Sequence, residues 1–112
     1  MAIEYDLFSG LDVGDLRRRL DMAAVEAGDL WTHSSATGDL GPFAWDILAE
    51  QGHVGEFRSR AYVRFDKFRS IEAKRKLQDF YRSLPAPKVV LFQMDPTDQD
   101  TFLEPIPHDA SE

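Results

Sequence analysis

Cysteine is absent from the 112 residues of this chain, which excludes disulfide bonds, thiolate metal sites and cysteine nucleophiles. No apolar run approaches the roughly 18 residues that a membrane helix needs, so we expect no membrane contact. The N-terminal residues lack the basic and apolar pattern of a secretory signal. These absences together predict a cytoplasmic protein.

Recognisable cofactor and metal motifs are also missing. The acids of the stretch DPTDQD lack the central glycine and the closing glutamate that an EF-hand requires. His53 and Glu56 alone are too few ligands for a zinc site. The scattered glycines form no phosphate-binding loop. The sequence therefore predicts no cofactor and no metal.

Basic residues are missing from the end of the chain and concentrated in its middle. Residues 1–57 carry 3 basic and 11 acidic side chains, residues 58–88 carry 10 basic and 3 acidic, and residues 89–112 carry 6 acidic and none that is basic. These segments have charges of -8, +7 and -6, which give the net charge of -7. Such polarisation indicates that charge matters either within the fold or toward a partner.

Apolar residues are abundant enough for a buried core. Hydrophobic residues make up 43% of the chain and aromatic residues 12%, which argues against disorder despite the high charge. The length is that of one domain. We expect a compact domain over residues 1–95 and an acidic, proline-containing tail over residues 96–112, which Phe102, Leu103 and Ile106 could tether to the body.

Alternating apolar and polar residues predict strands near the N-terminus and in the middle of the chain. Near the N-terminus, Tyr5 and Leu7 would face the core and Glu4 and Asp6 the other side. A weaker strand is expected at residues 30–32, followed by a polar turn, and a buried strand at residues 88–94. The clearest alternation, over residues 56–66, places Phe57, Ser59, Ala61, Val63 and Phe65 on the core side.

Helical spacing predicts three helices between these strands. The first follows Asp12 as N-cap and stops at Gly28, and the last follows Ser70 and stops at Pro85. An additional helix is expected over residues 42–51. The order of elements predicts an α+β fold, a ferredoxin-like split βαβ sandwich. Its antiparallel sheet would have helices on one face, an inserted helix before the third strand, and the first and third strands side by side at its centre.

In that topology, acidic and basic side chains share the sheet face opposite the helices. Glu4 and Asp6 of one central strand would lie beside the basic side chains of the other. Opposite charges on neighbouring strands stabilise a sheet by roughly 0.2–1 kcal/mol per pair. Internal neutralisation is therefore one interpretation of the basic residues Arg58, Arg60 and Arg64.

The segment RSRAYVRF, residues 58–65, resembles the longer signature of the RNA recognition motif family. Ser59 replaces the glycine of that signature and Arg60 its first aromatic residue. The resemblance implies a sheet on which Tyr62, and Phe8 as a second aromatic residue, stack on bases. Single-stranded nucleic-acid binding is therefore an alternative function. The matching residues are Arg58, Ala61, Tyr62, Val63 and Phe65.

An enzyme without a recognisable motif is a further alternative. His33 offers a general base beside Ser34 and Ser35, but no nucleophile elbow or oxyanion hole accompanies them. Serines in a polar turn commonly satisfy backbone groups instead. We therefore expect no catalytic residue.

The acid excess favours a non-catalytic protein–protein interaction module. Small acidic inhibitors and regulators, such as immunity proteins and phage-encoded inhibitors, dock on basic macromolecules with this charge profile. The expected partner is thus another protein with a basic surface, while a homodimer formed through the sheet is an alternative. Tryptophans are frequent anchors of such interfaces. The candidate binding residues are Arg58, Arg60, Tyr62, Arg64, Trp31, Trp45, Asp95, Asp98 and Asp100.

Overall fold

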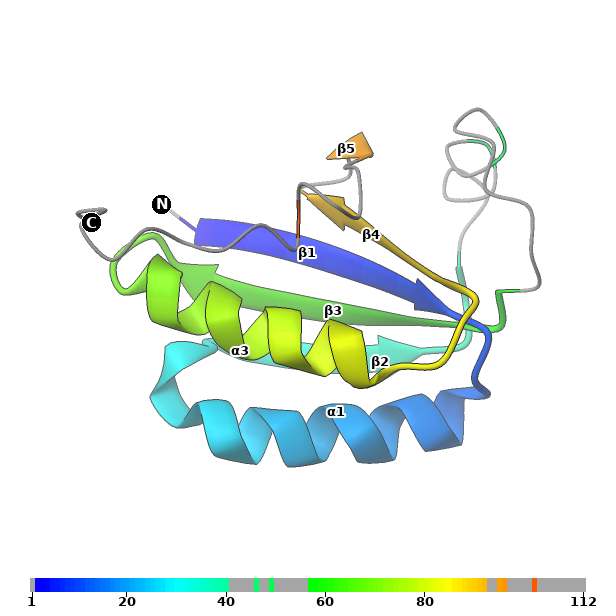
Figure 1. The fold of residues 1–112 in the computed structure, drawn as a ribbon, viewed down its shortest axis with the longest axis horizontal. Coiled ribbons are helices and arrows are strands. Elements are labelled where there is room, and N and C mark those ends of the chain that lie inside the picture. Colours follow the sequence, from blue (N-terminus) through cyan, green and yellow to red (C-terminus); the bar gives the residue numbers. More distant parts are fainter. Residues whose placement is uncertain are drawn as a thin grey trace.

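The structure, a computed structural model, describes residues 2–40, 46, 49, 57–92, 95–96 and 102. Within these residues, an antiparallel sheet carries helices α1 and α3 on one of its faces (Figure 1). This arrangement confirms the predicted α+β class. Among the described helices, none is both long and apolar enough to cross a membrane.

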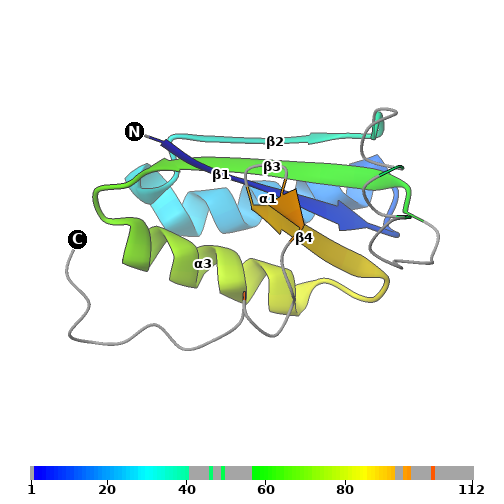
Figure 2. The same ribbon diagram turned by 90° about the horizontal axis from the view of Figure 1, so that it is seen from above.

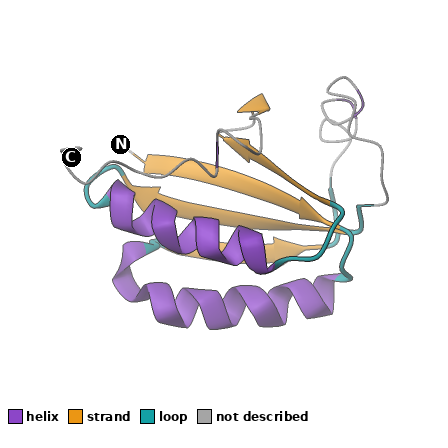
Figure 3. Ribbon diagram, in the orientation of Figure 1, coloured by secondary structure: helices purple, strands orange, loops and turns teal. Residues whose placement is uncertain are grey.

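The described strands form the sheet in the order β2-β3-β1-β4-β5 (Figure 3). β1 and β3 are antiparallel neighbours at its centre, as the sequence predicted. β4 pairs antiparallel with the other side of β1, and the two-residue β5 extends that edge. The strands are β1 (Ala2–Ser9), β2 (His33–Thr37), β3 (Ser59–Asp66), β4 (Lys88–Phe92) and β5 (Asp95–Pro96).

Helix α1 (Val13–Ala27) begins and ends where its capping residues predicted. The carboxylate of Asp12 accepts a hydrogen bond of 2.9 Å from the backbone N–H of Asp15, which satisfies one of the free donors of the first turn. Gly28 follows the helix with φ of 58°, a conformation that favours glycine, and opens the short 3-10 helix η1 (Gly28–Leu30).

Helix α3 (Ser70–Ser83) starts at the predicted place, but Arg69 rather than Ser70 is its N-cap. Arg69 has φ of 67° and makes no side-chain cap hydrogen bond. At the other end, the ammonium group of Lys88 donates to the carbonyls of Tyr81 at 2.9 Å and Leu84 at 2.8 Å. A strand residue thus satisfies carbonyls that the end of a helix leaves free.

The main core lies between the sheet and the two helices (Figure 2). Phe102, from beyond the predicted compact domain, is 2% exposed within it. Its ring lies 5.4 Å from Tyr5 and 5.3 Å from Tyr81, and its carbonyl accepts a hydrogen bond of 2.9 Å from the Gln78 side chain. The predicted tether at Phe102 is therefore confirmed. The core includes Leu7, Val63, Phe65 and Val90 of the sheet, Leu16 and Leu20 of α1, and Leu77 and Tyr81 of α3.

A second apolar cluster lies on the opposite face of the sheet, which we interpreted from the sequence as an open face with acidic and basic side chains. Phe57 was expected on the core side, which is wrong. It precedes β3, and its ring packs 6.5 Å from that of Phe8. The members of this second cluster are Phe8, Leu40, Phe57, Val89 and Leu91.

The predicted strand at residues 30–32 is also wrong, because β2 begins at His33. Leu30 belongs to the 3-10 helix, and Trp31 is buried, where its indole N–H donates to the carbonyl of Ala73 at 3.1 Å. The polar residues that we interpreted as a turn instead pair with β3, with Ser34 opposite Val63. Pairing with a central strand overrides the weak strand propensity of serine.

Several sequence predictions fall outside the described residues. The expected helix over residues 42–51 is one of them, although Asp46 and Ala49 have helical backbone conformation. The others concern Trp45, Asp98 and Asp100. The predicted boundary at residue 95 also stays a prediction.

The substitution Phe102→Ala should lower the free energy of unfolding by about 3 kcal/mol, because it leaves a cavity between the rings of Tyr5 and Tyr81 in the main core. Phe68→Ala removes the same ring from a position that is 78% exposed and should change stability by less than about 0.5 kcal/mol. Urea denaturation of both variants measures the difference. Equal effects would show that Phe102 does not belong to the core.

Candidate functional site

Polar side chains of three strands gather on the face of the sheet opposite the helices. Because β1 and β3 are in register, Glu4 lies opposite Arg64, Asp6 opposite Tyr62 and Phe8 opposite Arg60. β2 adds His33 and Ser35 to the same face, since they pair with Arg64 and Tyr62. We call these residues the polar patch: Glu4, Asp6, His33, Ser35, Arg60, Tyr62 and Arg64.

Tyr62 is held in the polar patch by a hydrogen bond. Its hydroxyl donates to a carboxylate oxygen of Glu4 at 2.6 Å. Burial and this hydrogen bond to Glu4 both raise the pKa of Tyr62 above its ordinary value. The predicted sharing of one face by Glu4 and Tyr62 is thus confirmed, and the carboxylate engages the phenol.

Asp6 and Arg60 form the most buried ion pair of the described residues. The carboxylate of Asp6 lies 3.7 Å from Nε of Arg60, and its side chain is 8% exposed. Burial raises the pKa of Asp6 above its ordinary value, the Arg60 charge lowers it, and Glu4 raises it further. Nε of Arg60 is buried and has no hydrogen-bond partner among the described residues. The pair therefore neutralises charge inside the fold.

His33, Tyr62 and Arg64 are neighbours within the polar patch and bring aromatic and basic side chains together. The His33 ring lies 5.6 Å from the Tyr62 ring. Arg64 is exposed and makes no ion pair within 4.0 Å to a described residue. Ser34 points to the opposite face of β2, so of the two serines considered beside His33 only Ser35 shares its face. No group of three or more potential metal ligands occurs in the described part of the chain.

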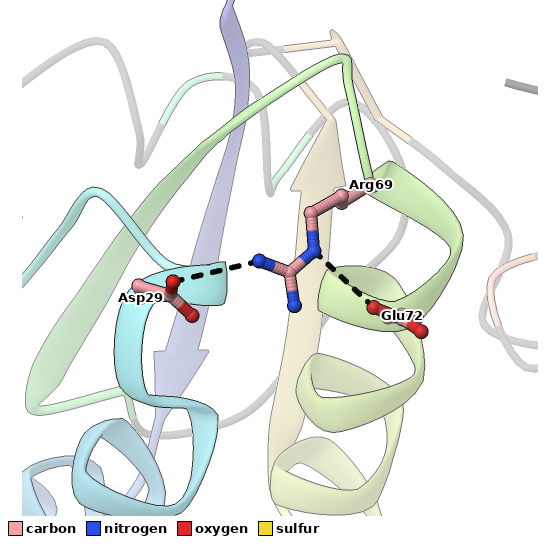
Figure 4. Close-up of polar contacts among 3 residues, drawn as sticks. All are labelled: Asp29, Arg69 and Glu72. Atoms are coloured by element: carbon pink, nitrogen blue, oxygen red, sulfur yellow. Dashed lines mark hydrogen bonds and ion pairs between the residues drawn. The ribbon is translucent and has the colours of Figure 1, made fainter.

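Three further arginines pair with acids of the helices. Arg69 lies 3.5 Å from Asp29 of η1 and 3.4 Å from Glu72 of α3 (Figure 4). Arg18 pairs with Asp15 along α1, and Arg82 pairs with Asp79 along α3. These pairs are exposed, so each contributes little to stability.

The acid excess lies in two stretches of the sequence that contain no basic residue. Residues 41–56 contain three acids and residues 93–112 contain six. The rest of the chain carries all 13 Lys and Arg side chains and 11 of the 20 acids, which gives it a charge of +2. The acids of the two stretches are Asp46, Glu50, Glu56, Asp95, Asp98, Asp100, Glu104, Asp109 and Glu112.

The first acidic stretch is attached at the second cluster. Leu40 and Phe57, which flank residues 41–56, are both 6% exposed in that cluster. Leu91 of the same cluster pairs with Pro96 of β5, and Asp98 and Asp100 follow β5 in the sequence. Glu104, Asp109 and Glu112 instead follow Phe102, which is buried in the main core. The described residues that flank the acids therefore lie on both faces of the sheet.

The structure places the predicted binding residues in several different surroundings. Arg60, Tyr62 and Arg64 share the polar patch, while Arg58 is exposed just before β3. Trp31 is 6% exposed in the main core, so we leave it out of the surface. The backbone of Asp95 pairs with Phe92, next to the second cluster. Trp45, Asp98 and Asp100 lie outside the described residues. The apolar second cluster was missed, although the buried pattern of β4 signalled it.

Comparison of this chain with protein-family models, with curated proteins and with solved structures found no match.

The pKa of Asp6 should lie above 3.8 and rise further in Arg60→Gln, because that change removes the charge that lowers it. Because folding raises the pKa of Asp6, the folded state binds the Asp6 proton more tightly than the unfolded state does. Protonated Asp6 therefore contributes to stability at low pH, and this contribution is lost as pH rises from 3.8 through the folded pKa. Carboxyl NMR titration measures this pKa. Arg64→Gln is the matched control and should leave it unchanged, whereas a fall in Arg60→Gln would contradict the assignment.

Proposed function

We propose that this protein is a non-catalytic interaction module that docks on a basic surface of another protein. The observation that carries the proposal is the separation of charge: residues 41–56 and 93–112 contain nine acids and no cation, and the first of these stretches is attached at Leu40 and Phe57 of the second cluster. Charge on one side of a molecule steers encounter with a partner of opposite sign and selects against others. Asp95, Asp98 and Asp100 would take part in this docking.

An inhibitor or regulator is the kind of module that we infer. Such a protein needs a stable scaffold and a charged surface, and it needs no catalytic group. The polar patch supports this division, because Asp6 pairs with Arg60 inside the fold and the carboxylate of Glu4 accepts the hydrogen bond of Tyr62. The absence of cysteine supports a cytoplasmic location for it.

We also propose that the fold is ferredoxin-like, with residues 41–56 inserted before the third strand. The strand order β2-β3-β1-β4 supports this topology, as do the two described helices on one face. The insertion would then follow the edge strand β2 and return beside β1.

Quantitative affinity capture from a host lysate tests the docking proposal. Asp98→Asn/Asp100→Asn should weaken retention of a basic protein roughly tenfold, because two steering charges are lost. Asp21→Asn/Asp66→Asn removes the same charge from exposed positions of the body and should retain the partner. Equal retention by both double variants, or capture of an acidic partner only, would refute the proposal.

Single-stranded nucleic-acid binding is a second candidate, favoured by the adjacent rings of His33 and Tyr62 beside Arg64. Phe8 cannot supply the second stacking ring, because it is 0% exposed. If the candidate holds, Tyr62→Ala should abolish salt-sensitive binding of labelled oligonucleotides, while Tyr62→Phe should preserve it by keeping the ring. Fluorescence anisotropy at low and moderate salt measures this. Absence of binding at low salt would eliminate the candidate.

A further inference from the structure

The outer side of helix α1 exposes apolar side chains that the fold does not use. Met22 is 68% exposed and Val25 is 81% exposed, and among the described residues only Phe68 joins them as an exposed large hydrophobic side chain. The buried positions Leu16 and Leu20 face the sheet from the other side of the same helix. α1 therefore has one apolar stripe in the core and a second, short apolar surface toward solvent, formed by Met22 and Val25.

A hollow lies beside this exposed apolar surface, between α1 and α3. It has a volume of 480 Å³, and its walls include Met22 and Ala23 of α1 and Phe80 of α3. Phe80 is 4% exposed and belongs to the main core. The hollow thus offers an apolar base next to a flexible methionine, a side chain that adapts its shape to a partner.

Charges of opposite sign flank Met22 at equal spacing. Arg18 lies four residues before it and Glu26 four residues after it, so the three share one stripe of the helix. If two such helices pack antiparallel with a two-fold axis at Met22, Arg18 of each copy faces Glu26 of the other. From this complementarity we infer that the outer side of α1 binds α1 of a second copy of this chain.

The other contacts of this pairing are compatible with it. Met22 of each copy would contact Met22 of the other copy at the two-fold axis. Both side chains would lie next to the hollow between α1 and α3. Arg18 is free to exchange its partner, because its pair with Asp15 is exposed on both sides, at 70% and 42%. Asp15 would approach Asp29 of the second copy, where Arg69 already provides a compensating charge (Figure 4).

This dimer is independent of the proposed docking function. α1 covers the face of the sheet opposite the polar patch and the second cluster (Figure 2). Each dimer would leave the second cluster of both copies, where residues 41–56 are attached, on the side away from the α1 pair, which would make the assembly bivalent toward a partner. One pair of 15-residue helices is a small interface, so we expect a dissociation constant on the order of 100 μM.

Sedimentation equilibrium of the full chain tests the dimer. The wild type should dimerise, whereas Arg18→Glu and Glu26→Arg should each weaken dimerisation roughly tenfold, because each places like charges across the axis twice. Mixed in equal amounts, the two variants should form a heterodimer, since every facing pair then has opposite signs. This restoration is specific to the pairing of positions 18 and 26.

Controls separate this contact from general charge effects. Lys67→Glu makes the same charge change in the turn before α3, so it should dimerise like the wild type and should not restore Glu26→Arg in a mixture. Met22→Glu should abolish the dimer, and unchanged circular dichroism spectra would show that the variants fold. A monomeric wild type up to about 1 mM, or no association in the Arg18→Glu and Glu26→Arg mixture, would overturn the inference.

Discussion

The antiparallel pairing of β1 with β3 is the constraint on which the other features depend. Its register places Tyr5 and Val63 together on the helix-covered face, and Asp6 and Tyr62 together on the other face. A slip by one residue would exchange the two faces, exposing core side chains and burying several charges. The buried rings around Phe102 and the ion pair of Asp6 with Arg60 both require this one register.

Residue patterns predicted the central elements because each has a strong periodic signal. β1, β3 and both helices alternate or repeat over at least eight residues, and capping by Asp12 and Gly28 marked the ends of α1. β2 gave no such signal. It is a polar edge strand, and its conformation comes from pairing with β3 rather than from its own residues.

The polar patch was predictable in composition but not in its pairings. Alternation placed Glu4, Asp6 and the arginines on one face, yet only the register decides that Glu4 binds Tyr62 and that Asp6 pairs with Arg60. The second cluster escaped prediction for a related reason. Phe57 leaves the alternation of β3 before the strand begins, and Leu40 comes from outside any strand. Contacts distant in sequence leave no local pattern.

Most of the chain is nearly balanced in charge, at +2, while residues 41–56 and 93–112 carry nine acids. Like charges distributed over the rest of the chain would repel one another and lower its stability. Arg60 of β3 instead pairs with Asp6 of β1, and Arg69, just before α3, pairs with Asp29 of η1 and Glu72 of α3. The acid excess, in turn, lies in segments whose sequences contain no competing cation. The register of β1 and β3 does not depend on these acids, because it is set by the apolar and polar faces of the two strands.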